Sequence, residues 1–350
     1  MRILQVLLPV GLGGVERIAA MLHEYGNCNG DTMGMAIGKS YASHLLNKFN
    51  VRNTDSIFLI DDTSMINDLK TLRKIVKEFR PDIIHTHARR ECFLSCLINF
   101  NGINTRTQHM AENPHIRVTW GEKLLLKHSV SLWIATSRQL KKNYINKLGY
   151  IDEKKVRVIY NGINLSAAKT HEDRIYKFCI ISRLSYQKGI DILLEQIHQM
   201  PDELKERIKI DLWGEGPEKT KLLNMIHDNK LENNVCYRGV TYKPEEQLYH
   251  YDALLMPSRY EGLPLTMLES MACKTPVAIH NVGCVSEFMH NHVNGWIIDD
   301  HFTWKDFFSQ LTDIQYPWEK VSEQSYRTYC EAFKGEGMCK RYFELFNSLL

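Results

Sequence analysis

The chain has 350 residues, of which 44% are hydrophobic and 24% charged, a composition typical of a soluble globular protein with about two domains. No apolar run reaches the ~20 residues of a membrane span, and the run at residues 3–10 is too short for a signal peptide. The nine cysteines include no Cys-x-x-Cys pair, which argues against a zinc site or a disulfide framework and indicates reduced thiols in a cytoplasmic protein.

The net charge of +3 combines two unlike halves of the chain. Residues 1–170 contain 24 Lys and Arg against 14 Asp and Glu, whereas residues 171–350 contain 20 against 27. The basic first half suggests an anionic partner. Six of its basic residues fall in two helical patterns rich in Leu, Ile and Tyr, which favours an anionic membrane surface over nucleic acid; solvated helix faces are the alternative. They are Lys123, Lys127, Arg138, Lys141, Lys142 and Lys147.

Short apolar runs alternate with helical patterns through the first half. This alternation predicts a parallel, doubly wound α/β sheet with ligand sites at the carboxyl ends of its strands. The predicted strands are residues 3–8, 33–37, 57–60, 82–85, 105–109, 132–135 and 156–159, and the predicted helices are 15–25, 65–79, 90–99 and 138–148.

A polar stretch at residues 164–174 predicts a linker, and a second alternating series follows it. We therefore expect two Rossmann-like β/α/β domains, residues 1–165 and 172–315, that face each other across a ligand cleft. We expect the helical segment 318–350 to pack back on the first domain. The strands predicted for the second domain are 178–181, 208–213, 235–237, 253–256 and 277–280, and its helices are 190–200, 219–229 and 264–273.

The most informative motif is the span from Glu261 to Pro276. Pro264 suits a first helical turn, so Glu261 is expected in the loop before a helix and Glu269 about one and a half turns inside it. The free N–H groups of the helix start lie between these carboxylates and suit a phosphate. An anion-binding site with a hydrogen-bond acceptor on each side fits a nucleotide-sugar. The alternative is that Glu261 and Glu269 are two ordinary surface glutamates.

Two cations offer the matching countercharge. Arg183 and Lys188 lie between a predicted strand and a predicted helix, where both can converge on a diphosphate; ordinary surface charge is the alternative. The chain has no Asp-x-Asp, which argues against a metal ion on the diphosphate and assigns the charge to these cations and to helix dipoles.

A glycine run at residues 11–14 follows the first strand and precedes a helix. Gly13 and Gly14 let the backbone approach a bulky or anionic ligand. Glu16 stands where the dinucleotide fingerprint requires glycine, and the second strand ends without the acid that would hold a ribose. These departures argue against an NAD site.

Three histidines close predicted strands. His109 is placed to contact a ligand in the expected cleft. His85 and His87 have no carboxylate or third histidine nearby in the sequence, so we expect no metal there.

In this order, these motifs resemble the retaining, nucleotide-sugar-dependent glycosyltransferases of the GT-B architecture, group 1 or family 4-like. The similarity runs along almost the whole chain. The matching segments are 13–17 (Gly-Gly-Val-Glu-Arg), 81–85, 158–162, 183–189, 214–217, 238–239 and the E-x₇-E block with Thr275-Pro276-Val277.

The resemblance implies a donor site in the second domain and an acceptor site in the first. Arg183 and Lys188 would bind the diphosphate and stabilise the departing nucleoside diphosphate, and Glu269 would accept hydrogen bonds from the ribose. The other implied contacts are Glu261 and Gly262 with the sugar, the N–H groups of Leu265 and Thr266 with phosphate, Gly13 and Gly14 with the diphosphate, His109 with the sugar near the reacting carbon, and the backbone at Arg238 and Gly239 with the base.

The resemblance further implies activity without a metal ion or cofactor. The donor would be a nucleoside-diphosphate sugar, a UDP-sugar in preference to a GDP-sugar, and the acceptor a lipid-linked glycan in surface polysaccharide or lipopolysaccharide assembly. We expect a cytoplasmic enzyme, peripheral on the inner face of the membrane, with no nucleic acid partner. A nucleotide-sugar epimerase on the same architecture and a catalytically silent sugar-nucleotide-binding subunit are the alternatives.

Four residues depart from the family pattern. Ser182, Lys274 and Cys284 stand where the pattern has glycine, and Ser270 stands where it has alanine. We therefore expect altered backbone geometry near the phosphate loop.

Overall fold

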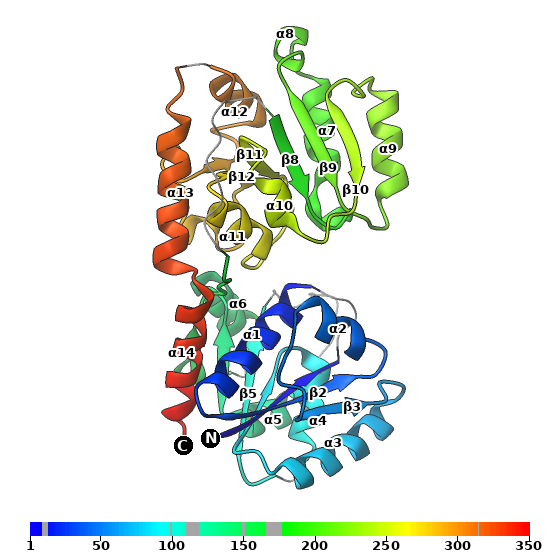
Figure 1. The fold of residues 1–350 in the computed structure, drawn as a ribbon, viewed down its shortest axis with the longest axis vertical. Helices are drawn as coiled ribbons and strands as arrows, with labels where there is room; N and C mark the ends of the chain where they lie inside the picture. Colours follow the sequence, from blue (N-terminus) through cyan, green and yellow to red (C-terminus); the bar gives the residue numbers. More distant parts are fainter. Residues whose placement is uncertain (9–12, 99, 110–118, 149–150, 166–176, 314) are drawn as a thin grey trace. The chain divides into compact units, whose positions relative to one another are not determined.

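In a computed structural model, the chain forms two α/β units, shown in Figure 1. The structure describes residues 1–350 except 9–12, 99, 110–118, 149–150, 166–176 and 314. Unit 1 comprises Met1–Gly162 and Gly335–Leu350, and unit 2 comprises Ile163–Lys334. Most of the predicted linker lies outside the described residues.

Unit 1 is built on a seven-stranded parallel sheet in the order β3-β2-β1-β4-β5-β6-β7. Most strand residues are buried, as expected for a parallel sheet covered on both faces. The strands are β1 (Arg2–Leu7), β2 (Thr32–Gly38), β3 (Ile57–Ile60), β4 (Ile83–Thr86), β5 (Ile103–Gln108), β6 (Leu132–Ala135) and β7 (Val156–Val158). The helices are α1 (Gly14–Cys28), α2 (Ala42–Lys48), α3 (Met65–Phe79), α4 (Arg89–Cys96), α5 (Trp120–Ser129), α6 (Arg138–Leu148) and α14 (Gly335–Asn347).

The alternation of side chains along β1 supplies two separate cores. Leu4 and Val6 pack with residues of α3 and α4 on one face, whereas Leu7 packs with residues of α1 and α2 on the other. Helix α14 lies against α1, where the rings of Tyr25 and Phe343 are 5.3 Å apart between centroids.

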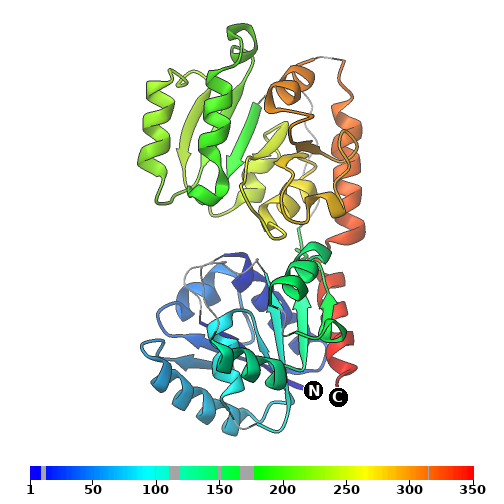
Figure 2. The same ribbon diagram turned by 180° about the vertical axis from the view of Figure 1, so that it is seen from behind.

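Unit 2 has a six-stranded parallel sheet in the order β10-β9-β8-β11-β12-β13. Helices α7 and α9 cover one face of β8, β9 and β10 (Figure 2). The strands are β8 (Lys177–Ile181), β9 (Lys209–Trp213), β10 (Val235–Gly239), β11 (Ala253–Met256), β12 (Val277–His280) and β13 (Trp296–Ile298). The helices are α7 (Ile190–His198), α8 (Asp202–Lys205), α9 (Lys219–Asp228), α10 (Pro244–Leu248), α11 (Leu265–Ala272), α12 (Trp304–Leu311) and α13 (Trp318–Ala332).

The prediction of two Rossmann-like α/β domains is confirmed in its fold class. Every predicted strand is present, with ends displaced by at most two residues. The sequence missed β13 and the helices α2, α8, α10 and α12. These elements are short, so each contains too few residues for a period to be recognised.

The prediction that the whole segment 318–350 packs on the first domain is wrong for its first half. Helix α13 belongs to unit 2, because Trp318 and Val321 enter its core and the Trp318 indole N–H donates to the Asp252 carbonyl at 2.6 Å. Only α14 joins unit 1. No helix within the described ranges is long and apolar enough to span a membrane.

Candidate functional site

In unit 2, the loops that follow β8 and β11 are held together by backbone contacts. The N–H of Arg259 donates to the Gln187 carbonyl at 2.8 Å. Gly189 has φ +61°, and a Cβ there would lie 2.0 Å from the Pro257 carbonyl oxygen. Only glycine permits both this conformation and this close approach. The Arg183–Gly189 loop is therefore fixed against the loop that carries Glu261.

Lys188 and Glu261 form an ion pair at the junction of these two loops. The Lys188 ammonium lies 2.6 Å from Oε1 of Glu261, which also accepts a hydrogen bond from the Ser258 hydroxyl at 2.7 Å. The Glu261 side chain is 5% exposed and that of Lys188 19% exposed. A hydrogen-bonded ion pair of this kind holds both groups in place. The structure thus brings together two of the predicted site residues that are distant in sequence.

Arg183 has a different environment from Lys188. Its side chain is exposed, and no residue that the structure describes forms a hydrogen bond or ion pair with it. A guanidinium in this state can bind a diphosphate bidentately without first breaking an ion pair inside the protein.

Helix α11 begins directly after the Glu261 loop. Pro264 occupies the cap position before the first helical residue, one position earlier than predicted, and Leu265 and Thr266 form the start of the first turn. Glu261 lies in the loop and Glu269 within the helix, as predicted, and Glu269 is 5% exposed. The N–H groups of the first turn of a helix favour an anion, so this end of α11 suits a phosphate.

The structure describes the surroundings of two residues that depart from the family pattern, Cys284 and Lys274. Gly283 has φ +60°, and a Cβ there would lie 2.4 Å from the Glu261 carbonyl oxygen, so the glycine that this approach requires is present. Cys284 has an ordinary φ of −96°, and its thiol donates to the Gly262 carbonyl at 3.1 Å. Lys274 adopts the left-handed φ of 56°, and its ammonium pairs with Glu323 at 2.9 Å.

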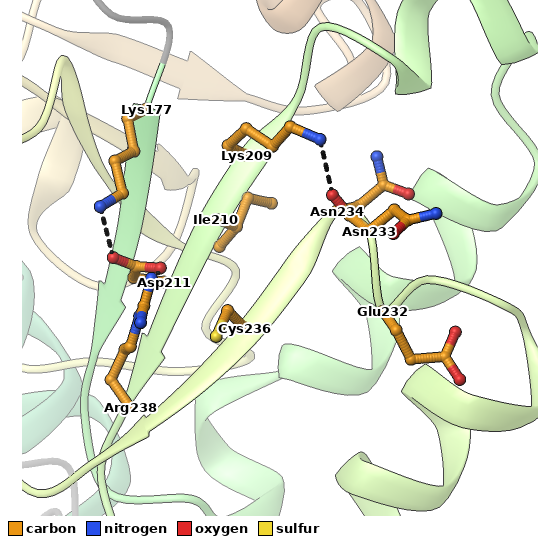
Figure 3. A pocket seen from close by; sticks show the side chains of 9 residues that line it. All are labelled: Lys177, Lys209, Ile210, Asp211, Glu232, Asn233, Asn234, Cys236 and Arg238. Carbon is orange, nitrogen blue, oxygen red and sulfur yellow. Dashed lines mark hydrogen bonds and ion pairs between the residues drawn. The ribbon is translucent and has the colours of Figure 1, made fainter.

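Arg238 and Gly239 end strand β10. The Arg238 side chain turns to Asp211, with Nε 2.9 Å from Oδ1. Both residues line a cavity of about 240 Å³ together with Lys177. Figure 3 shows the side chains that line this cavity. Lys177 also pairs with Asp211 at 2.8 Å, and Tyr251 donates to Asp211 at 2.8 Å. Burial opposes ionisation of Asp211, but these three partners outweigh it and lower its pKa. Because Asp211 holds the Arg238 guanidinium, the backbone at this strand end is the part suited to a ligand.

In unit 1, the glycine loop is capped by a carboxylate. Gly13 is the cap residue of α1, and its N–H donates to Oε2 of Glu16 at 2.7 Å. Burial raises the pKa of Glu16. Gly14 is the first helical residue, while the preceding residues of the run, 11 and 12, lie outside the described part. Glu16, the residue that breaks the dinucleotide fingerprint, therefore has a structural role in orienting this loop.

Glu91 is a functional candidate that the sequence analysis missed. Its Oε1 accepts from the N–H of Leu8 at 2.6 Å, and its Oε2 accepts from the N–H of Ala88 at 2.5 Å. The carboxyl thus joins the ends of β1 and β4, and burial raises its pKa to about 7. No local pattern identifies it, because Leu8 is 83 positions away in the chain.

The three predicted histidines lie together in unit 1. His87 Nδ1 is 3.1 Å from Nε2 of His109, and His87 Nε2 is 3.0 Å from Oε1 of Gln5. Burial lowers the pKa of His109 to about 4, with a further contribution from the Arg106 charge, and burial likewise lowers the pKa of His85 to about 3. The pKa of His87 also lies well below its usual value, chiefly through burial. Within the described ranges, no three His, Cys, Asp or Glu side chains are placed to hold a metal ion.

Comparison with known proteins relates both halves of the chain to glycosyltransferases. Residues 163–326 match the family model of glycosyl transferases group 1, and residues 13–167 match that of glycosyltransferase family 4. Both models describe glycosyltransferases, and together they cover residues 13–326 of the chain. Solved GT-B structures share its fold across its whole length. Anabaena HepE in complex with UDP has a TM-score of 0.82 at 18% identity, with 100% of both chains covered.

Relatives found by sequence match over only part of their length. The poly(ribitol-phosphate) alpha-N-acetylglucosaminyltransferase of Staphylococcus aureus is 28% identical over 57% of this chain and 41% of its own. The O-antigen biosynthesis glycosyltransferase WclY of Escherichia coli is 25% identical over 63% of this chain and 64% of its own. The chain thus matches less than two thirds of the length of these two curated relatives.

Proposed function

We propose that the chain is a retaining glycosyltransferase that moves a sugar from a nucleoside-diphosphate sugar to a hydroxyl group of a glycan acceptor. The observation that carries the proposal is the Lys188–Glu261 pair, 2.6 Å apart at the N-terminal end of α11. The exposed guanidinium of Arg183, which has no ion-pair partner among the described residues, lies on the same loop as Lys188. Cations and free helix N–H groups suit a diphosphate, and Glu261 and Glu269 offer acceptors for hydroxyl groups. The family match and the UDP-bound HepE neighbour support this choice of ligand.

In the proposed reaction, the bond between the anomeric carbon of the sugar and the diphosphate oxygen breaks. The acceptor oxygen forms its new bond to that carbon on the same face, and the acceptor's proton passes to the departing diphosphate. Arg183, Lys188 and the first turn of α11 stabilise the negative charge that develops on the leaving group. No metal ion is needed for this step, since protein cations supply the charge.

The test is a thermal-shift screen of the full chain against UDP-, GDP- and ADP-sugars, followed by product analysis. A bound donor raises the apparent melting temperature by mass action. We expect a UDP-sugar to give the largest shift, and turnover to persist in EDTA. NMR of the product formed on turnover then shows its anomeric configuration. An inverted anomer would contradict the retaining mechanism.

The same experiment separates the alternative functions. Isomerised nucleotide-sugar without nucleotide release would identify an epimerase. A melting shift without turnover for any donor and acceptor pair would identify a catalytically silent binding subunit. Release of nucleoside diphosphate with stoichiometric glycosylation of the acceptor supports the proposal.

We further propose that the acceptor is lipid-linked, that the glycan belongs to a surface polysaccharide, and that unit 1 binds the anionic inner face of the cell membrane. The exposed face of α5 carries Trp120 and Leu124, which are 78% and 43% exposed, together with the exposed residues Lys123 and Lys127. Arg89 pairs with Glu122 at 2.7 Å and holds this helix to α4. An aromatic ring among lysines suits the interface of an anionic bilayer. The relatives named for O-antigen and poly(ribitol-phosphate) support a surface glycan.

Sedimentation with anionic liposomes tests this surface. We expect Trp120→Ala to weaken binding at low salt, and Lys123→Glu with Lys127→Glu to abolish it. Tyr242→Ala is the matched control, because Tyr242 is an equally exposed aromatic residue, 78%, in unit 2. Binding that is absent at low salt, or unchanged by high salt, would reject the membrane surface.

A further inference from the structure

A chain of hydrogen bonds connects His109 to helix α1 through two other buried side chains. His109 contacts His87 at 3.1 Å, His87 contacts Gln5 at 3.0 Å, and the Gln5 amide nitrogen donates to the Ala19 carbonyl at 2.9 Å. Gln5, His87 and His109 are 1%, 4% and 8% exposed. They come from β1 and from the ends of β4 and β5, which are neighbours in the sheet.

The direction of this chain follows from its last member. Because the Gln5 amide nitrogen donates to a carbonyl, its oxygen is the atom that faces His87. An amide oxygen only accepts hydrogen bonds, so Nε2 of His87 carries a proton. A neutral imidazole has one donor and one acceptor nitrogen, so Nδ1 of His87 accepts, and Nε2 of His109 is the donor.

We infer that Gln5 and His87 are positioning residues that hold His109 as the neutral tautomer with its proton on Nε2, so that Nδ1 presents a lone pair to a hydroxyl group of a bound carbohydrate. In this state His109 is a hydrogen-bond acceptor and has no acidic proton to give to the leaving group. The identity of the ligand rests on the proposed function, whereas the tautomer does not.

The surroundings of the three rings agree with neutral side chains. Among the described residues, the charged or titratable groups that interact with His109 are His87, His85 and Arg106, and Glu91 lies at the His87 backbone. Burial together with the Arg106 charge opposes protonation of His109. Desolvation of a buried imidazolium without an anionic partner is unfavourable. We call the hydrogen-bonded chain from Gln5 through His87 to His109 the relay. Its two imidazole rings are therefore neutral at neutral pH, and no carboxylate among the described residues is bonded to either ring.

A second, parallel chain offers an internal comparison. His85 contacts Thr105 through Nδ1 at 2.8 Å and Thr107 through Nε2 at 3.2 Å, and Thr107 contacts the Tyr342 hydroxyl of α14 at 3.0 Å. Thr105 donates to the Ile84 carbonyl, so its oxygen accepts from His85. His85 thus has its proton on Nδ1, the opposite tautomer from the one assigned to His87 and His109.

Nitrogen-15 NMR of the full chain labelled at histidine tests the assignment without substrate. We expect His109 and His87 to be neutral with the proton on Nε2, and His85 to be neutral with the proton on Nδ1. A protonated His109 at pH 7.5, or one with its proton on Nδ1, would overturn the inference.

Three variants test the relay. Gln5→Met removes the acceptor that orients His87, so we expect the His109 nitrogen shifts to move toward a mixture of tautomers and kcat/KM to fall about 10-fold, the effect of one lost hydrogen bond. His87→Gln keeps an acceptor and a donor, and should retain more activity than His87→Leu. Thr107→Val is the control: it breaks the parallel chain, which among the described residues forms no hydrogen bond with His87 or His109, and should leave the His109 tautomer unchanged.

The outcomes distinguish the relay from the proposed function. Unchanged His109 shifts and kcat/KM in Gln5→Met would reject the relay, as would equal effects of Gln5→Met and Thr107→Val on the His109 shifts. If NMR shows the predicted tautomers but the protein transfers no sugar, the proposed function is rejected and the relay is still supported.

Discussion

The ammonium of Lys188 lies 2.6 Å from a carboxylate oxygen of Glu261, and this contact ties the loop after β8 to the loop after β11. The two residues are 73 positions apart in the chain and come from adjacent strands of the unit 2 sheet. Because carboxyl ends of parallel strands meet at one edge of a sheet, the pair stands where a ligand of an α/β domain is expected.

Removal of the Lys188 ammonium should impair the reaction strongly. We expect Lys188→Ala to lower kcat/KM by at least ~100-fold, because a charge that stabilises the departing diphosphate is lost and the buried Glu261 carboxylate is left without its partner. Steady-state kinetics with the donor found by the binding screen measures this. The control is Lys219→Ala, which breaks the exposed pair with Glu215 at 3.0 Å and should leave the rate nearly unchanged. A near-normal rate for Lys188→Ala would reject its role.

Glu269 should contribute to donor binding through the ribose. Glu269→Ala is expected to lower kcat/KM by at least ~100-fold, because buried hydroxyl groups of the ligand would lose their acceptor. Titration of the melting temperature with the donor tests binding separately from turnover. The exposed Glu246 of α10 serves as a control, and Glu246→Ala should bind the donor normally. Equal donor affinity in both variants would contradict the assignment.

Gly189 should resist substitution because of its backbone conformation. The left-handed conformation costs a residue with a side chain roughly 1–2 kcal/mol. The Cβ of Gly189→Ala would also meet the Pro257 carbonyl oxygen at 2.0 Å. We therefore expect Gly189→Ala to lower the free energy of unfolding of unit 2 by at least about 2 kcal/mol, measured by urea denaturation.

Gly121 supplies the comparison for this variant. It lies in the first turn of α5, and a Cβ there would meet no atom within 4 Å. Gly121→Ala should be neutral or should stabilise unit 1 by up to about 1 kcal/mol. If Gly189→Ala were as well tolerated as Gly121→Ala, the loop conformation described for unit 2 would be wrong.

Unit 1 should lose stability as the pH falls below about 6.5. His85, His87 and His109 have lowered pKa values in the folded state, so the unfolded chain binds protons first. Each such histidine lowers the free energy of unfolding by about 1.4 kcal/mol per pH unit. Glu91 acts in the opposite sense, because its folded pKa of about 7 exceeds the unfolded value and it keeps its proton between them. We expect a net loss on the order of 2 kcal/mol between pH 6 and pH 5.

Urea denaturation at several pH values measures this dependence. His85→Gln removes one of the three titrating groups and should make the dependence on pH shallower. His227, whose side chain is 79% exposed, supplies the control, and His227→Gln should leave the slope unchanged. An unfolding free energy that does not change between pH 6 and pH 5 would contradict the buried, neutral state of the three rings.

Asp211 should be important for the stability of unit 2. Its carboxylate, 5% exposed, holds Lys177 and Arg238 on the same face of the sheet. Asp211→Asn should cost about 1–3 kcal/mol in the free energy of unfolding, because two cations lose their partner while remaining partly exposed. Asp202→Asn breaks the exposed pair with Lys205 and should leave the free energy of unfolding nearly unchanged. Equal losses in the two variants would show that the Asp211 cluster has no special role.

The positions of the strands, and of the helix that carries Glu269, were determined by nearby residues alone. The buried parallel strands are short apolar runs, so they were predicted from sequence to within two residues at each end. The loop position of Glu261, the helical position of Glu269 and the helix that starts near Pro264 also follow from nearby residues.

The contacts between distant segments were decided only by the tertiary structure. The pairing of Lys188 with Glu261, the hydrogen bond of His87 with His109 and the capping of the Leu8 N–H by Glu91 all depend on which strands become neighbours. The division of the C-terminal segment between α13 and α14 depends on which core each helix enters. The spacing of hydrophobic residues along a helix or strand reflects interactions within a few residues. The order of the strands is instead set by the packing of the whole domain.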